Sequence, residues 1–300
     1  MGNRIFRRTT EDYVIDTFVY FVLAIVFITT LYPFYYSLVI SFNNGVDASS
    51  GGIYFWPRSF TLDNYAAVFS NEQLLKGFGV TISRTVIGTV LSVTLTALFA
   101  YSLAYPQLMF KKIYFTILII AMYFSGGLIP YFILVNKLHL MNTFLVYIVP
   151  SLLGVFNTVI MMSFFRDLPM ELKESAKIDG ARDFTIFYKI MMPLSTPVLA
   201  TIALFVGVGH WNNWFDAAYF VTDKDLKTAS FWLMDLINRA NLTGVQGGES
   251  NRGVGMATQT FTAETIRMAT MIVIVLPIVL VYPFLQKYFV KGITVGAIKG

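Results

Sequence analysis

The sequence contains no cysteine and few charged residues. The absence of Cys from all 300 residues excludes disulfide bonds, thiolate metal sites and cysteine nucleophiles. Only 13% of the residues are charged, against about one quarter in soluble domains, whereas 56% are hydrophobic and the mean hydropathy is +0.65. With His139 and His210 as its only histidines, the chain also lacks a His-Glu-x2-His metal site. Most of such a surface is unsuited to water, so we expect an integral membrane protein.

Six apolar stretches of about 20 residues account for this composition. A helix of that length crosses about 30 Å of hydrocarbon and satisfies its own backbone hydrogen bonds. The expected spans are residues 18–40, 81–105, 113–135, 144–165, 194–215 and 269–290. Prolines inside these spans predict kinks rather than breaks, at Pro33, Pro130, Pro150, Pro197 and Pro277. The sequence therefore predicts an all-α, polytopic membrane protein that forms one domain over residues 1–300.

The distribution of Lys and Arg sets the expected orientation of the spans. If the N-terminus is inside, thirteen of these residues lie on the cytoplasmic side and four on short outer segments. This bias predicts that both termini and the segment 166–193 are cytoplasmic. The first apolar run is too long for a signal peptide and no small-x-small cleavage site follows it, so we expect an uncleaved span.

The segment 166–193 is charged and helix-prone, although it lies between two apolar spans. Asp167 is expected to cap a short helix with Pro169 in its first turn, and Asp179 and Gly180 are expected to form a bend. Beyond the bend, apolar residues recur every three or four positions, at Ala181, Phe184, Phe187 or Tyr188, and Met191. The pattern predicts a folded amphipathic projection whose apolar face is covered.

The same segment contains a motif with defined spacing. Its residues are Glu174, Ser175, Ala176, then Gly180, and then Ile190, Met192 and Pro193. The motif resembles the EAA signature of ABC-importer permease subunits, with Ser175 in place of Ala and Met192 in place of Leu. The six spans, the stretch GHWNNWFDAAYF and the tail YPFLQKYFVKGITVGAIKG resemble the carbohydrate-uptake, maltose-permease type of this family. A solvated charged loop is the competing interpretation of the motif.

The resemblance implies a transport subunit rather than an enzyme. It assigns ATPase coupling to residues 166–193, here called the EAA segment, through Glu174, Ser175, Ala176, Gly180, Ile190 and Pro193. The chain lacks a Gly-x4-Gly-Lys-Ser/Thr phosphate loop, so ATP and Mg²⁺ are expected on a partner ATPase and no cofactor on this chain. The expected partners are an ABC ATPase dimer, a second similar permease subunit, an extracellular sugar-binding protein and membrane lipid, but no nucleic acid. The expected location is the bacterial cytoplasmic membrane.

Candidate substrate-pathway residues gather toward the outer end of the fifth span. They are Trp211, Asn212, Asn213, Trp214 and Asp216. Aromatic faces, amides and carboxylates suit sugar binding, and an ionisable residue near a span is a functional candidate. Trp is also typical of the membrane–water interface, so an anchoring belt is the competing interpretation. Arg84, near the outer end of the second span, is expected to extend to that interface.

The predicted function is the import of a carbohydrate by alternating access, and an oligosaccharide is the favoured substrate. The outer segments 41–80 and 221–268 are expected to receive a sugar-loaded binding protein or to cover the pore. The tail 291–300 either reaches the ATPase or is a frayed end. The alternatives are an importer of another solute, such as a glycerophosphodiester or a peptide, a secondary carrier or a polytopic membrane enzyme. The last two classes call for ionisable or catalytic clusters within the spans, which the sequence does not show.

Overall fold

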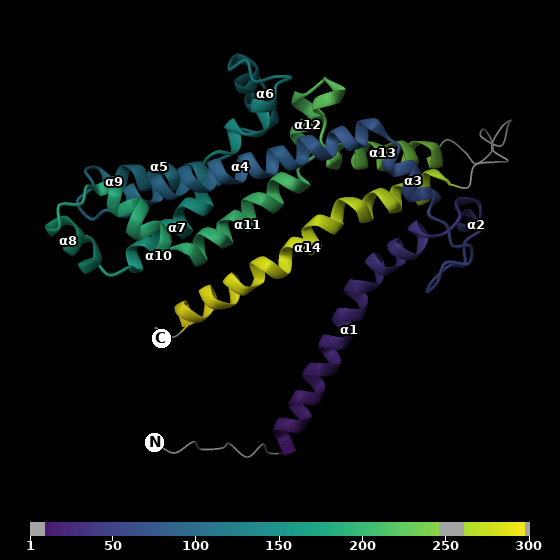
Figure 1. Cartoon of the computed structure of the whole chain (residues 1–300), viewed down its shortest axis with the longest axis horizontal. Coiled ribbons are helices and arrows are strands. Elements are labelled where there is room, and N and C mark those ends of the chain that lie inside the picture. Colours follow the sequence, from purple (N-terminus) through teal and green to yellow (C-terminus); the bar gives the residue numbers. More distant parts are fainter. Residues whose placement is uncertain (1–9, 246–260, 298–300) are drawn as a thin grey trace. The chain divides into compact units, whose positions relative to one another are not determined.

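A computed structural model describes residues 10–245 and 261–297 of the chain. Within these ranges the protein is built from helices, with one isolated β-bridge between Asn43 and Phe60 and no strand (Figure 1). The expectation of an all-α membrane protein is thereby confirmed. The described residues belong to two compact units, one drawn from Met1–Ser70 and Ala240–Val273 and the other from Asn71–Arg239 and Ile274–Gly300.

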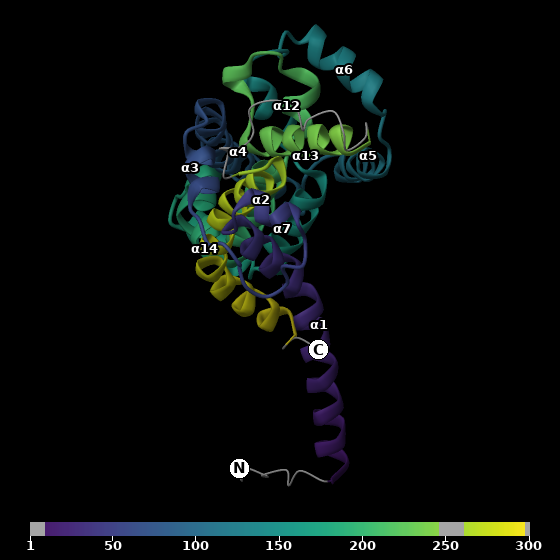
Figure 2. The same ribbon diagram turned by 90° about the vertical axis from the view of Figure 1, so that its right-hand side faces the viewer.

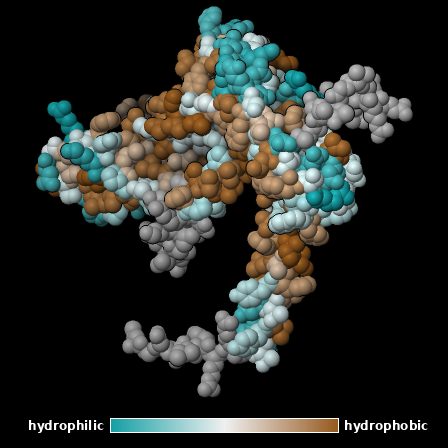
Figure 3. All heavy atoms as spheres, turned by 45° about the vertical axis from the view of Figure 1, so that its right-hand side comes forward, coloured by the Kyte–Doolittle hydropathy of each residue, from teal (hydrophilic) through white to brown (hydrophobic). Residues whose placement is uncertain are grey.

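The first unit contains a long apolar helix and two short ones. They are α1 (Thr10–Ser41), α2 (Gly45–Ser49) and α3 (Asp63–Phe69). The most apolar window of α1 has the length and hydropathy of a membrane span, and none of it is buried against the chain. Figure 3 shows apolar side chains over much of the visible face of this helix. Pro33 lies inside α1 without ending it, as the sequence predicted.

Polar side chains hold the end of α1 to the short helices. The Asn64 amide donates hydrogen bonds of 2.8 Å to the carbonyls of both Ser41 and Asn43. Asn44 caps α2, because its side-chain oxygen accepts a hydrogen bond of 2.9 Å from the backbone nitrogen of Val46. After the apolar part of α1, the chain therefore forms a compact cap, built from α2 and α3 and held by hydrogen bonds.

The second unit is organised around α4 (Glu72–Ala104). This helix packs along α7 (Val155–Asp167) and α11 (Thr196–Asn212), and the three run side by side in Figure 1. Its buried positions include small residues such as Gly88, Ser92 and Ala97, which let neighbouring helices approach closely. By length and hydropathy, α4 alone could span a membrane. The same is true of α1 and of the Ala263–Phe284 part of α14 (Ala263–Ala297).

The other three expected spans fall on bent pairs of helices, and in the last pair the first helix lies in the segment before the expected span 194–215. α5 (Lys111–Tyr123) and α6 (Leu128–Lys137) meet at 116°, which Figure 2 shows as a change of direction between them. The pairs Phe144–Ser151 with α7, and Asp183–Leu194 with α11, bend by 46° and 81°. The structure thus has three spans, or up to six if each bent pair is one span.

The bends correct the expectation that the prolines only kink the spans. Pro197 occupies the second position of α11, and Pro150 lies in η2 (Val149–Ser151). Pro130 is in the first turn of α6, after the break at residues 124–127. Proline lacks the N–H that a helix interior needs but fits the first turn, so at these three positions it accompanies a break.

Short helices follow α11. They are α12 (Phe215–Phe220), η4 (Lys224–Leu226) and α13 (Ala229–Val245). Most of the Gly-rich part of the second outer segment, the basic N-terminus and the last three residues of the tail lie outside the described residues.

Replacing Gly45 by Ala is expected to destabilise the first unit. The added Cβ would lie 2.3 Å from the backbone nitrogen of Thr262 and 2.6 Å from the carbonyl carbon of Phe261. Backbone atoms cannot swing aside as a side chain does, so we expect a loss of about 1–3 kcal/mol in the free energy of unfolding. The measurement is the melting temperature of the purified protein in lipid nanodiscs.

Gly79→Ala is the matched control for this change. No atom lies within 4 Å of its added Cβ, and Ala is the better helix former by about 1 kcal/mol. Equal melting temperatures for the two variants would contradict the close approach at Gly45.

Candidate functional site

The EAA segment folds into a helix, a sharp turn and a second helical run. α8 (Glu171–Ile178) is followed by α9 (Asp183–Ile186), the π-helical η3 (Phe187–Met191) and α10 (Met192–Leu194). The expectation that Asp167 caps α8 is wrong, because α7 continues through Asp167 and Met170 is the residue before α8. Leu168 precedes Pro169 and has an extended backbone, as residues before proline favour, and this ends α7.

Gly180 ends α8 in a left-handed conformation. Its φ is +81°, and its N–H donates to the carbonyl of Lys177 at 3.0 Å. The N–H of Ala181 donates to the carbonyl of Ala176 at 2.9 Å, and both alanines belong to one apolar cluster. These bonds and this apolar contact define a Schellman motif, which favours Gly at that position. The predicted bend is confirmed, and the Ala176-to-Gly180 spacing is explained by how the helix ends.

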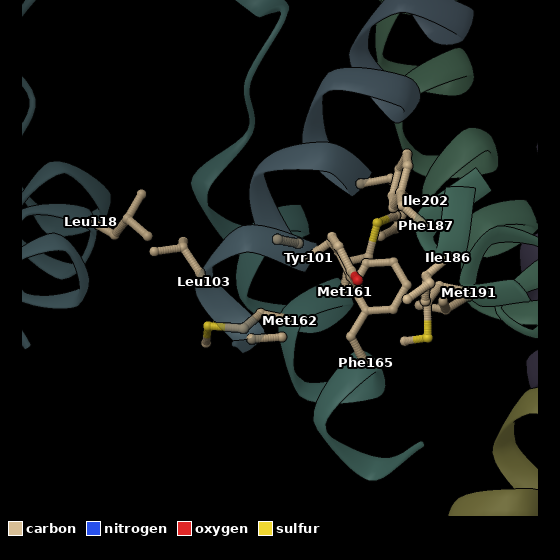
Figure 4. Packing of buried hydrophobic residues seen from close by; sticks show 14 of the residues in the cluster. Tyr101, Leu103, Leu118, Met161, Met162, Phe165, Ile186, Phe187, Met191 and Ile202 are labelled. Carbon is tan, nitrogen blue, oxygen red and sulfur yellow. The ribbon is translucent and has the colours of Figure 1, made fainter. Parts of the chain in front are cut away.

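The apolar face of the EAA segment packs on the spans of its own chain. Ile186, Phe187 and Met191 are buried beside Tyr101 of α4 and Phe165 of α7 (Figure 4). The Tyr101 ring centroid lies 5.2 Å from that of Phe187 and 5.9 Å from that of Phe165. The predicted face is therefore covered from within the chain at Ala181, Phe187 and Met191, whereas Phe184, which was also expected on it, is exposed. The sequence left Phe187 and Tyr188 as alternatives for one position on this face. Phe187 is buried there, and Tyr188 is exposed.

Two lysines connect α8 to the end of α4. Lys173 is buried, with its Nζ 5.0 Å from the Tyr101 ring centroid, and burial lowers its pKa. The Nζ of Lys177 donates to the Tyr105 hydroxyl at 2.8 Å and pairs with Asp183 at 3.1 Å. These two hydrogen-bonded contacts raise the pKa of Lys177. α8 is thus held to the end of α4 by two lysines that, four residues apart, lie on one face of the helix.

The motif residues divide between an inner and an outer side. Ala176 is buried and Ile190 is partly buried against the same cluster, so these two position the segment. Glu174, Ser175, Gly180 and Pro193 are exposed. The exposed side also displays large apolar side chains, namely Ile178, Phe184 and Tyr188, with exposures of 86%, 69% and 66%. Exposed apolar groups of this size around a short helix are typical of a contact surface.

The candidate substrate-pathway residues lie where α11 ends and α12 begins. Trp211 is buried and its indole Nε1 donates to the carbonyl of Ile274 at 3.0 Å. Asn212 is exposed and Trp214 is half-buried. The side-chain oxygen of Asn213 accepts a hydrogen bond of 3.2 Å from the backbone nitrogen of Asp216. The structure therefore brings Asn213 and Asp216 together, and leaves Asn212 available at the surface.

Arg84 is the centre of a buried polar cluster at this junction. Its side chain is 1% exposed and forms an ion pair with Asp216. It also donates to the Asn213 carbonyl at 3.0 Å and, through Nε, to Nδ1 of His210 at 3.3 Å. The guanidinium carbon lies 4.6 Å from the Tyr147 ring centroid. The expectation that Arg84 extends to the interface is wrong, because these groups provide its partners inside the protein.

The Arg84 cluster joins α4, η1 (Phe144–Tyr147), α11 and α12. The His210 ring fits against Gly88, where a Cβ would lie 2.5 Å from Nε2. The hydroxyl of Tyr147 donates to the carbonyl of Leu226 at 2.8 Å, which extends the junction to η4. Sequence reasoning missed this cluster, although a lone Arg and a lone His in two apolar spans are the signal that could have revealed it.

A separate cavity of about 370 Å³ lies among α4, α11 and α14. Its lining is mainly apolar and includes Val86, Val90, Leu204, Val208, Trp211 and Ile278. Sugar hydroxyls need hydrogen-bond partners when they leave water. This lining provides few, so the cavity is not a suitable sugar site.

Comparison with known proteins places these features in a family. The model of the "Binding-protein-dependent transport system inner membrane component" family matches residues 2–295. The chain is similar to protein LplC of Bacillus subtilis (37% identity over 271 residues, 90% of each chain). It is also similar to the polygalacturonan/rhamnogalacturonan transport system permease protein YtcP of the same species (35% over 303 residues, 100% of each chain).

Two further similarities concern oligosaccharide and polysaccharide transport. The arabinooligosaccharides transport system permease protein AraQ of Halalkalibacterium halodurans is 28% identical over 282 residues, 92% of this chain and 94% of that one. A crystal structure of a bacterial ABC transporter involved in the import of the acidic polysaccharide alginate contains a similar chain. The TM-score is 0.85 at 25% identity, over 94% of this chain and 99% of that one.

Replacing Asp216 by Asn is expected to destabilise the junction strongly. The change leaves the Arg84 guanidinium buried without its counter-charge, which costs about 3–5 kcal/mol when a buried pair is broken in this way. The measurement is thermal unfolding in nanodiscs, with Arg84→Met and the double variant completing the cycle. We expect the double variant to be less destabilised than the sum of the single changes.

Asp225→Asn provides the control, because it breaks an exposed pair in the same unit. Lys76 and Asp225 are 3.1 Å apart, with side chains 45% and 64% exposed. Such a pair contributes about 0–1 kcal/mol. Similar losses from Asp216→Asn and Asp225→Asn would show that the Arg84 charge is not buried as described.

Proposed function

The chain belongs to the family of binding-protein-dependent transport system inner membrane components, and from this premise we propose that it is the permease subunit of an ABC importer for an oligosaccharide. The family is found in the inner membrane, in agreement with the apolar helices of the chain. The proposed substrate class is supported by the relatives, whose names specify polygalacturonan/rhamnogalacturonan and arabinooligosaccharides, and by the alginate importer.

The observation that carries the proposal is the architecture of the EAA segment. Its inner side packs on α4 and α7, and its outer side exposes Glu174 together with large apolar side chains. We assign the outer side to docking on a separate ATPase dimer, which binds ATP and Mg²⁺. Glu174 is placed there to pair with a basic group or with backbone donors of that partner.

α4 provides a route by which movement of α8 reaches the far part of the membrane domain. Lys173 and Lys177 hold α8 at Tyr101 and Tyr105, close to the end of α4. Arg84 lies about 25 Å away along the same helix at 1.5 Å per residue. Because a helix is stiff along its axis, a displacement of α8 is transmitted to the junction of α11 and α12. This coupling suits alternating access, in which the bundle changes from inward-facing to outward-facing.

The remaining parts of the transporter follow from the same proposal. A second, similar permease subunit completes the pore, and an extracellular sugar-binding protein delivers the substrate to the outer segments. Asn212 and Trp214 are the members of the fifth-span cluster with surface available to a sugar. Trp211, Asn213 and Asp216 are already engaged within the chain, and we assign them to positioning that surface.

Replacing Gly180 by Pro is expected to abolish uptake of labelled oligosaccharides by intact cells. Proline cannot adopt the positive φ of this turn and has no N–H for the bond to Lys177. We expect the variant to stay inserted in the membrane but to lose the ATPase on affinity purification. Uptake and co-purification that both survive the change would mean that the EAA segment is only a solvated loop.

A surface change separates docking from folding. Ile178 is 86% exposed, so Ile178→Ser removes little packing within the chain. We expect it to lower ATPase co-purification at least several-fold while the melting temperature of the permease stays the same. Val46→Ser, at a position 62% exposed in the first unit, is the matched control and should retain the ATPase. If Ile178→Ser retains it equally well, this side of α8 is not the docking surface.

A further inference from the structure

A short loop of the first unit exposes three consecutive aromatic residues. Tyr54, Phe55 and Trp56 lie between α2 and α3, with exposures of 60%, 71% and 77%. Exposed aromatic side chains this large and contiguous are uncommon on a surface that faces only water. We therefore expect the loop to lie in an environment that accepts apolar rings.

Hydrogen bonds hold the loop in a defined shape. Nε of Arg58 pairs with the Asp47 carboxylate at 3.2 Å, and its Nη2 donates to the carbonyls of Asp47 at 3.1 Å and Gly51 at 2.8 Å. Gly51 and Gly52 have φ of +70° and +74°, which lets the chain reverse without steric cost. The aromatic side chains are therefore presented at a set position, and the Arg58 side chain is used within the unit.

The loop packs on the end of the apolar part of α1. The hydroxyl of Tyr35 donates to the carbonyl of Phe55 at 2.6 Å, and the ring centroids of Tyr32 and Phe55 are 6.2 Å apart. α1 exposes apolar side chains up to this level, whereas Ser37, Val39 and Ile40 are buried against the cap. The loop thus continues the apolar surface of a membrane span at the place where that surface ends.

We propose that the aromatic loop, residues 54–56, inserts into the headgroup region of the bilayer beside α1. Trp and Tyr favour this zone because each ring is apolar and each has one polar group that stays hydrated. The backbone also suits the site: the Phe55 carbonyl already accepts the Tyr35 hydroxyl, and Pro57 has no N–H to satisfy. Lipid is the occupant of this surface, and the loop fixes the depth of the first span in the membrane.

The absence of cysteine from the chain permits a direct test of depth. A nitroxide attached to Trp56→Cys, in the assembled transporter in phospholipid nanodiscs, is compared with one on Ser50→Cys, an exposed site in the same unit. Collision with oxygen reports apolar surroundings and collision with a water-soluble nickel chelate reports water. Spin-labelled lipids provide the depth reference. We expect the ratio of oxygen to nickel collisions at Trp56 to be several-fold higher than at Ser50 and to match labels near the lipid glycerol.

Two results would overturn the proposal. A collision ratio at Trp56 equal to that at Ser50 would place the loop in water, where a binding protein could reach it. Low collision rates with both reagents would show that another protein chain, such as the second permease subunit, covers the loop. Thermal unfolding of each labelled variant verifies that the fold is retained.

Discussion

The buried positive charge of Arg84 determines how α4, η1, α11 and α12 meet in the second unit. Arg84 has no access to water, so its guanidinium must find partners within the protein, and it draws them from three other elements. If α11 continued past Asn212, the Asn213 carbonyl would accept from the backbone N–H of Ala217. Here it accepts from Arg84 instead. The break between α11 and α12, and the contact of η1 with α4, are both consistent with that requirement.

The opposite part of α4 is organised by a different kind of contact. There the lysines of α8 lie over or beside tyrosine rings, and the apolar side of the EAA segment fills the space between α4 and α7. These contacts combine a charged, partly exposed helix with an apolar core beneath it. The arrangement lets α8 present the proposed docking surface while it remains attached to the spans. α4 is thus the element that both ends of the proposed mechanism share.

The first unit meets the membrane in another way. α1 buries none of its apolar window in the chain, so lipid or another subunit must cover it. Its end is closed by the amide side chains of Asn64 and Asn44, which satisfy backbone groups where the helix stops. The aromatic loop lies at the border of these two environments, and its position follows from one hydrogen bond to α1 and from the bonds of Arg58 to Asp47 and Gly51.

The sequence by itself determined the features that depend on neighbours along the chain. Apolar runs predicted the membrane class, and the pair Asp179 and Gly180 predicted the turn after α8, because helix length and helix ends are local properties. Only the tertiary structure decided that Arg84 pairs with Asp216, 132 residues away, and that three spans are bent. It also decided which side of the EAA segment is covered and which is exposed. Such outcomes depend on which helices pack together, because a buried charge can pair only with groups that the packing places within contact distance.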